Sequence, residues 1–224
     1  TIEFTMLLRY SFPLILAFLL EHFFSLVSML VVGHLGKKEL AAVSLALMSS
    51  TITFGIFDGI ATALDTLCPQ AYGAGNYEYV SAHVQRCIML LFVVFVPCGV
   101  SWWWSKSLLQ YIIQDEKVLE LTSQFLRILL PGAPGYIFFG CVQRFLQAQG
   151  IFEASTGVLF VTAPINIVLS WFLVWNGRYG LGFIGAPIAS AIHFWLMSIF
   201  LVLYVVYIDG QKCWYGTIPF TDKF

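Results

Sequence analysis

The 224 residues of this chain have the composition of a membrane protein rather than a soluble enzyme. Hydrophobic residues make up 59% of the chain and charged residues only 10%, against roughly 25% charged residues in an ordinary soluble domain. The net charge of -1 provides no basic field that would attract nucleic acid, so nucleic acid is not an expected partner.

Six apolar segments, each long enough to cross a lipid bilayer, fill most of the chain. A spanning helix needs about 20 mainly apolar residues, and polar or turn-rich stretches separate segments of this size throughout the sequence. We therefore expect an all-α, multi-pass membrane protein whose six transmembrane helices form a single bundle over residues 1–224. The predicted helices cover residues 8–33, 40–67, 84–104, 117–139, 155–175 and 185–208.

The sequence contains no pattern typical of an enzyme or a metal site. The five cysteines are an odd number without a CxxC pair, and neither HExxH nor GxSxG occurs. We expect packing thiols rather than a disulfide or zinc site, no metal, no cofactor and no enzymatic activity. The chain does not begin with Met, and we expect a polar N-terminal region to precede it.

The first predicted helix carries a polar stripe. Glu21, Ser25 and Ser28 lie at helical spacings that place them on one face, and a charge inside a bilayer is a candidate for ion or substrate handling. Two interpretations of Glu21 remain open: it binds and releases a proton, or it stays protonated and bonds to another helix. For His22 and His193, packing or hydrogen bonding is preferred over a role as a proton relay.

In the second predicted helix, Thr51, Asp58 and Asp65 recur every seven residues. Their directions drift by only about 20° per heptad, so they share nearly one face, and that face cannot contact lipid. We expect Asp58 in the inner half of the membrane. A functional role and a structural role are equally open for this residue. Asp65 is placed near the edge, where capping or pairing is preferred over proton binding.

The fourth predicted helix contains Pro131 and Pro134, together with Gly132 and Gly135. Prolines remove helix hydrogen bonds, and broken helices inside a membrane are tolerated only against protein or a water-filled space. The segment serves either as a hinge or as a fixed kink, and we prefer the kink.

The fifth predicted helix carries Asn166 and Ser170, which are four residues apart and follow Pro164. Polar residues at this spacing either hydrogen-bond across helices or line a cavity. Helix packing is the preferred interpretation, and cavity lining is the alternative.

Four stretches of the sequence resemble the multidrug and toxic compound extrusion (MATE) family, in the form that fungal members carry. They are VGHLGKKELAAVSLA at 32–46, GIATALDTLCPQAYG at 59–73, RFLQAQG at 144–150 and GFIGAPIA at 182–189. The resemblance implies twelve helices in two six-helix lobes, of which this chain is the N-terminal lobe and lacks the second. It also implies a cation-coupled antiporter that exports xenobiotics, often organic cations, by alternating access from the vacuolar or plasma membrane.

The chain departs from the family pattern at two positions. Prokaryotic members commonly carry aspartates where Ser28 and Ser170 stand, so the prokaryotic proton site of this lobe is absent. The resemblance implies that eukaryotic members instead carry their coupling carboxylates on the second lobe, which this chain lacks. The coupling ion, H⁺ or Na⁺, stays open. Many relatives have asparagine at the position of Thr51 and glutamine or glutamate at that of Glu21.

The polar residues and the resemblance together define the candidate site. Candidates for binding substrate or ion are Glu21, Thr51, Asp58, Asn166 and Ser170, and structural or gating candidates are Asp65, Pro131 and Pro134. One alternative function is a flippase for a lipid-linked head group, which would need a more cationic cleft. Inside a helix, Arg127 is the only candidate that we expect for such a cleft. The other alternative is an inactive half-transporter fragment.

Overall fold

The computed structural model describes residues 2–111, 113–175 and 180–214, so the two ends of the predicted lobe, residue 1 and residues 215–224, lie outside the described residues. Within the described ranges, six helical spans are long and apolar enough to cross a membrane, as the sequence predicts. The spans are Ser11–Gly33, Lys37–Gly73, Tyr77–Trp103, Glu116–Ala148, Glu153–Trp175 and Gly182–Tyr207.

Nine α-helices and three short 3₁₀ helices make up the described secondary structure. In chain order they are α1 (Ile2–Gly33), α2 (Lys37–Ala61), α3 (Leu64–Gly73), α4 (Tyr77–Trp103), α5 (Ser105–Leu109), α6 (Glu116–Leu129), η1 (Leu130–Gly132), α7 (Ala133–Ala148), α8 (Glu153–Trp175), η2 (Gly182–Ile184), α9 (Gly185–Tyr207) and η3 (Gln211–Cys213).

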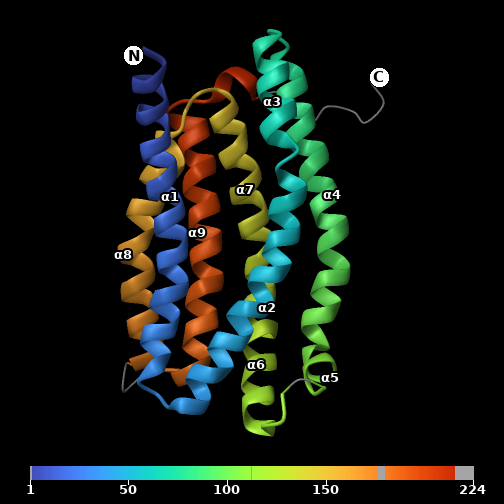
Figure 1. The fold of residues 1–224 in the computed structure, drawn as a ribbon, viewed down its shortest axis with the longest axis vertical. Helices are drawn as coiled ribbons and strands as arrows, with labels where there is room; N and C mark the ends of the chain where they lie inside the picture. The colour runs from blue at the N-terminus through green and yellow to red at the C-terminus, as the bar shows by residue number, and fades with distance from the viewer. Residues whose placement is uncertain (1, 112, 176–179, 215–224) are drawn as a thin grey trace.

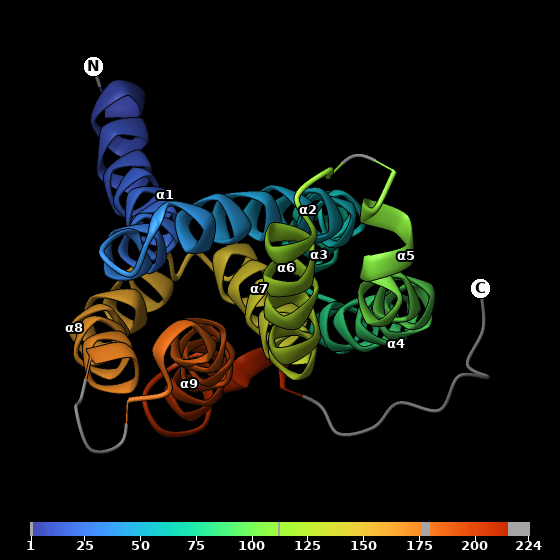
Figure 2. The ribbon, with the colours of Figure 1, turned by 90° about the horizontal axis from the view of Figure 1, so that it is seen from below.

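The long helices stand side by side as one bundle (Figure 1). The start of α1, helix α3 and the end of α9 lie at one end, here called the N-terminal end, whereas α5 and the α1–α2 loop lie at the other. Helix α9 packs against α7 and α8, and α8 packs against α1 (Figure 2). Helices α1, α2 and α3 form one face of the bundle, and α7 lies behind them (Figure 1).

Three predicted helix ends differ from the observed ones. The second span continues to Gly73, the third begins at Tyr77 and the fourth continues to Ala148, whereas the sequence predicts 67, 84 and 139. The predictions followed apolar composition, but polar residues at the membrane edge remain helical because the backbone hydrogen bonds continue through them.

A break that the sequence prediction lacks separates α2 from α3. At this point the Ala63 amide donates to the Ile60 carbonyl over 3.2 Å, and the Asp65 amide donates to the Thr62 carbonyl over 3.0 Å. Both bonds span three residues rather than the four of an α-helix. The Thr62 hydroxyl donates to the Gly59 carbonyl over 2.7 Å and so competes for a helix acceptor.

The proline segment forms a kink between α6 and α7. The 3₁₀ turn η1 contains Pro131, and Pro134 lies in the first turn of α7. The Trp195 indole on α9 donates to the Pro131 carbonyl over 2.8 Å, so a side chain of the neighbouring helix satisfies a carbonyl at the kink. This contact agrees with a fixed kink.

Two glycines allow α9 to approach this kink closely. A Cβ atom on Gly132 would lie 2.7 Å from the Cα atom of Ala191, and one on Gly135 would lie 3.0 Å from the carbonyl carbon of Phe194. Any larger residue at Gly132 would therefore push the two backbones apart.

Ion pairs join α6 to the start of α2 at the end opposite the N-terminal end. Asp115 caps α6 by accepting from the amides of Lys117 and Val118 over 3.0 and 3.4 Å. Its other oxygen lies 2.7 Å from Lys38 Nζ, and this hydrogen bond to Lys38 holds the pKa of Asp115 below its usual range. Lys117 Nζ lies 3.3 Å from Glu39 Oε1.

Candidate functional site

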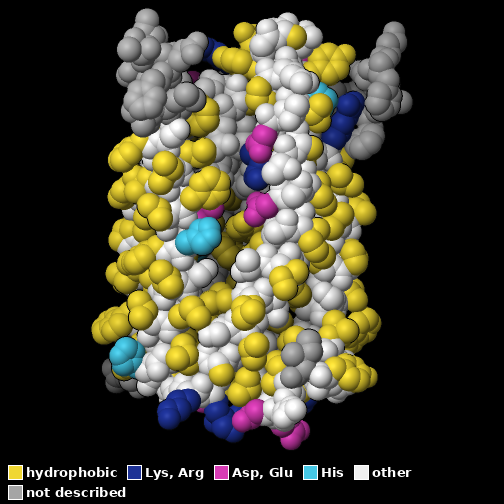
Figure 3. Space-filling view, viewed as in Figure 1, with side chains coloured by type: hydrophobic (Ala, Val, Ile, Leu, Met, Phe, Trp, Pro, Cys, Tyr) yellow, Lys and Arg dark blue, Asp and Glu magenta, His cyan; other side chains and the backbone are white. Residues whose placement is uncertain are grey.

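A polar groove interrupts the otherwise hydrophobic face between α1 and α2–α3 (Figure 3). Acidic and basic side chains gather in the hollow there, whereas hydrophobic side chains cover the surface on both sides and other charges lie at the ends of the bundle. A charge inside a bilayer is costly unless it faces protein or water. On this face of the bundle, the groove is therefore the part that differs most from a lipid-facing surface.

Two cavities make up the groove. The first, of about 470 Å³, lies toward the N-terminal end and is lined by Glu21, Asp58, Asp65, Tyr136 and Arg144, among others; we call it the charged cavity. The second, of about 460 Å³, extends between α1, α2, α8 and α9, and we call it the neutral cavity. Five residues line both cavities and form the border between them: Phe18, Glu21, Asp58, Tyr136 and Phe139.

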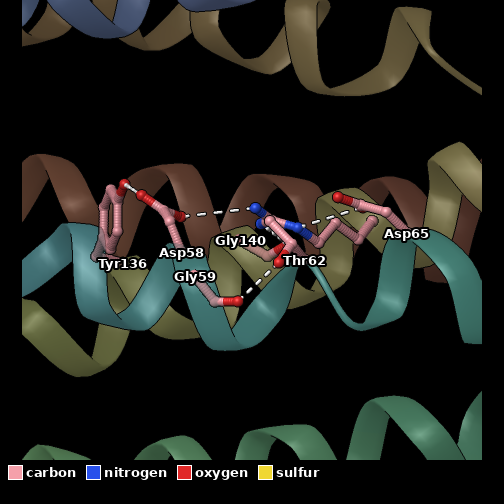
Figure 4. Close-up of polar contacts among 7 residues, drawn as sticks. Asp58, Gly59, Thr62, Asp65, Tyr136 and Gly140 are labelled. Carbon is pink, nitrogen blue, oxygen red and sulfur yellow. Dashed lines mark hydrogen bonds and ion pairs between the residues drawn. The ribbon is translucent and has the colours of Figure 1, made fainter.

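An arginine and two aspartates form a network in the charged cavity (Figure 4). Arg144 on α7 places Nη2 at 3.7 Å from Asp58 Oδ1 and Nε at 3.4 Å from Asp65 Oδ1. The Tyr136 hydroxyl donates to Asp58 Oδ2 over 2.7 Å, and Arg144 Nη1 donates to the Gly140 carbonyl over 3.1 Å. Arg144 thus bridges α2 and α3 across their break.

The two ion pairs are long. Charge-assisted N–H···O bonds are usually about 2.7–2.9 Å, and Arg144 Nε forms no hydrogen bond among the described residues. The Arg144 side chain is 15% exposed, whereas those of Asp58 and Asp65 are 42% and 50% exposed. Both carboxylates therefore face the groove and are more exposed than the guanidinium that lies between them.

Arg144 corrects the expectation that Arg127 is the only candidate for a cation of the cleft within a helix. The predicted fourth helix stops at 139, but α7 continues to Ala148 and carries Arg144 into the groove. The four-residue spacing of Tyr136, Gly140 and Arg144 puts them on one helical face and was the signal that could have identified it. Arg127 lines neither cavity; its Nε donates to the Trp103 carbonyl over 2.9 Å.

The groove brings together most of the residues that the sequence singled out. Glu21 and Asp58 line both cavities, Asp65 lines the charged cavity, and Thr51 and Asn166 line the neutral cavity. The seven-residue repeat on the second span therefore follows the length of the groove, as expected for a face turned away from lipid.

Three candidates lie outside the groove. Ser170 is buried, and neither it nor Pro131 or Pro134 belongs to the lining of either cavity. The Ser28 hydroxyl, by contrast, lines the neutral cavity and lies 3.4 Å from that of Ser190 on α9.

The balance of charge in the groove is acidic. The described lining contains the carboxyl groups of Glu21, Asp58 and Asp65 but only one guanidinium, that of Arg144. Low-dielectric walls strengthen electrostatic interactions, so this excess of carboxyl groups would act strongly on a charged group inside the groove. Among the described residues, no group of three or more His, Cys, Asp or Glu is placed to hold a metal ion. All five cysteines are free thiols.

Comparison with known proteins identifies relatives of this fold and sequence. The family model described as MatE matches residues 13–172. The chain is 58% identical over 214 residues, 96% of its length, to "Uncharacterized transporter YDR338C" of Saccharomyces cerevisiae, and 35% identical over 196 residues, 87% of its length, to "Protein DETOXIFICATION 15" of Arabidopsis thaliana.

A solved structure shares the architecture. The crystal structure of the eukaryotic MATE transporter AtDTX14 superposes with a TM-score of 0.84 and 31% identity, covering 95% of this chain. The chain spans 49% of that structure, 31% of the yeast relative and 40% of the Arabidopsis relative. It therefore corresponds to half or less of each of these proteins.

Proposed function

Because the chain belongs to the MATE family, we propose that it forms one lobe of a secondary antiporter that exports organic, mainly cationic compounds. The observation that carries this proposal is the acidic groove, in which three carboxyl groups face one guanidinium. A second six-helix lobe would cover the groove and complete a central cleft, since transporters built from repeats bind substrate at the interface between them.

Exchange of one cation for another at the carboxylates would couple export of the organic cation to entry of a proton or a sodium ion. An organic cation enters the groove and takes Asp58 as its counter-ion in place of Arg144, whose nitrogen lies 3.7 Å away. A proton or a sodium ion that reaches the carboxylates from the opposite side of the membrane removes this attraction, and the organic cation leaves. Rocking of the two lobes exposes the groove to one side at a time.

The substitution Asp58→Asn in the two-lobe protein tests this role. Asparagine can still accept from the Tyr136 hydroxyl, so the change removes the charge and little else. Hydrogen bonds to charged groups contribute about 1.5–3 kcal/mol, so the initial rate of ethidium efflux from proteoliposomes should fall by about tenfold or more.

Asp115→Asn is the matched control. It removes a carboxylate at the opposite end of the bundle and keeps a good helix cap, so its efflux rate should equal that of the wild type. Wild-type efflux by Asp58→Asn would remove Asp58 from the mechanism. Imposing a proton gradient and a sodium gradient separately identifies the coupling ion, and efflux that responds to neither gradient contradicts antiport.

A further inference from the structure

Arg127 is an exposed cation in a membrane-spanning segment, and the proposed transport does not use it. It belongs to α6, within the span Glu116–Ala148, and its side chain is exposed and lines neither cavity. It forms no ion pair with another described residue. Glu120, an exposed acid on the same face of α6, lies about two helical turns earlier. A charge in such a segment needs a partner, so the surroundings of the protein must supply one.

A hydrogen bond and an aromatic ring hold the guanidinium at the end of α4. Arg127 Nε donates to the Trp103 carbonyl over 2.9 Å. The guanidinium carbon lies 5.8 Å from the centroid of the Trp103 ring, within the range of a cation–π contact. No described residue accepts a hydrogen bond from Nη1 or Nη2. The guanidinium is therefore held through one nitrogen, and its two terminal nitrogens remain available to a ligand.

The surface around Arg127 has the character of a surface in contact with lipid. Of the six described spans, the one formed by α4 is the least buried, and α4 and α5 lie at the edge of the bundle furthest from α1 (Figure 2). Trp103 and Trp104 are 57% and 62% exposed, and tryptophans concentrate at the level of the lipid head groups. Arg127 therefore lies where a head group meets the protein.

The phosphate of a phospholipid matches this arrangement in charge and in geometry. A planar guanidinium presents its N–H donors as a rigid fork that binds phosphate oxygens through two parallel hydrogen bonds. About one and two turns deeper along α4, Val100 and Val96 are exposed, so acyl chains would have an apolar surface to lie on. A soluble anion would gain nothing from these valines, which favours a lipid over free phosphate.

We propose that Arg127, held against the Trp103 ring, forms a binding site for the phosphate group of a phospholipid at the junction of α4 and α6. The phosphate oxygens accept hydrogen bonds from Arg127 Nη1 and Nη2, the head group lies beside Trp104, and the acyl chains extend along Val100 and Val96. The site lies outside the groove, so it does not depend on the proposed export function.

Phosphatidylglycerol and galactosyl diacylglycerol with the same acyl chains provide the test, because only the first carries a phosphate group. Native mass spectrometry of the wild-type two-lobe protein with equal amounts of both lipids gives a dissociation constant for each successive bound lipid. Hydrogen bonds to a charged group change affinity by about tenfold or more, so at least one phosphatidylglycerol should bind about tenfold more tightly than any galactolipid. Equal binding of the two lipids would overturn the site.

The substitution Arg127→Gln should remove one such tightly bound phosphatidylglycerol and leave galactolipid binding unchanged. Lys117→Gln is the matched control, because it removes a cation of the same helix that already pairs with Glu39 at 3.3 Å. This control should keep every tightly bound phosphatidylglycerol of the wild type. If Arg127→Gln also keeps all of them, or if Lys117→Gln loses one as well, the preference comes from positive charge in general and the proposed site is wrong. Thermal unfolding of both variants shows whether they are folded.

Discussion

At the scale of single residues, Arg144 supplies a counter-charge to two of the three carboxyl groups of the groove. It reaches Asp58 and Asp65 from a third helix segment, and its guanidinium is itself mostly shielded from solvent. The acidic residues could be identified from sequence because charges are rare in apolar segments. Arg144 was missed because it lies beyond residue 139, where the fourth predicted helix ends, and only its four-residue spacing from Gly140 and Tyr136 indicates that it shares their helical face.

The network predicts a non-additive effect of its two aspartates on stability. Half-exposed ion pairs contribute about 0–1 kcal/mol each, so Asp58→Asn and Asp65→Asn should each lower the free energy of unfolding by about 1 kcal/mol or less. Together they should cost more than the sum, because Arg144 then remains buried without a carboxylate partner.

Thermal unfolding of the purified protein, followed by tryptophan fluorescence, measures the three variants. Adding Arg144→Met to the double variant should recover part of the loss, since no unpaired charge then remains. Strictly additive effects of the two aspartates would contradict a shared partner.

At the scale of elements, hydrophobic length predicts the six spans but not their interruptions. The sequence indicates the kink between α6 and α7 because prolines have a strong local effect on helices. The break between α2 and α3 involves Thr62 and Ala63, and neither residue interrupts a helix as proline does. It depends on which backbone carbonyl accepts a hydrogen bond from the Thr62 hydroxyl. This hydrogen bond depends on the surrounding structure, so composition and periodicity cannot predict the break.

The close approach of α9 to the kink predicts that Gly132→Ala is destabilising. The new Cβ would lie 2.7 Å from the backbone of Ala191, and overpacking of this kind costs about 1–3 kcal/mol. Gly157→Ala on α8 is the control, because its Cβ would meet no atom within 4 Å, and alanine is a better helix former by up to about 1 kcal/mol. In thermal unfolding, Gly132→Ala should have a lower melting temperature than the wild type, and Gly157→Ala should have an equal or higher one. Equal melting temperatures of the two variants would mean that the kink is free to move.

At the scale of the whole molecule, the chain is an integral multi-pass membrane protein with an apolar exterior and a polar groove on one face. The family membership accounts for the fold. The proposed selectivity for cations rests on the groove, because its carboxyl groups outnumber its arginine. The proposed export therefore requires that the groove be an aqueous, cation-attracting path rather than a sealed part of the core.

Thiol labelling at Thr51 tests this claim most directly. Thr51→Cys, which lines the neutral cavity, and its neighbour Ile52→Cys, an exposed position that lines neither cavity, are each placed in a cysteine-free two-lobe protein. They are treated with cationic and anionic methanethiosulfonate reagents of similar size. We expect Thr51→Cys to react, with a preference for the cationic reagent above that of free cysteine in water, and Ile52→Cys to stay unreactive in lipid. A Thr51→Cys thiol that is as inert as Ile52→Cys, or that prefers the anionic reagent, would contradict the account.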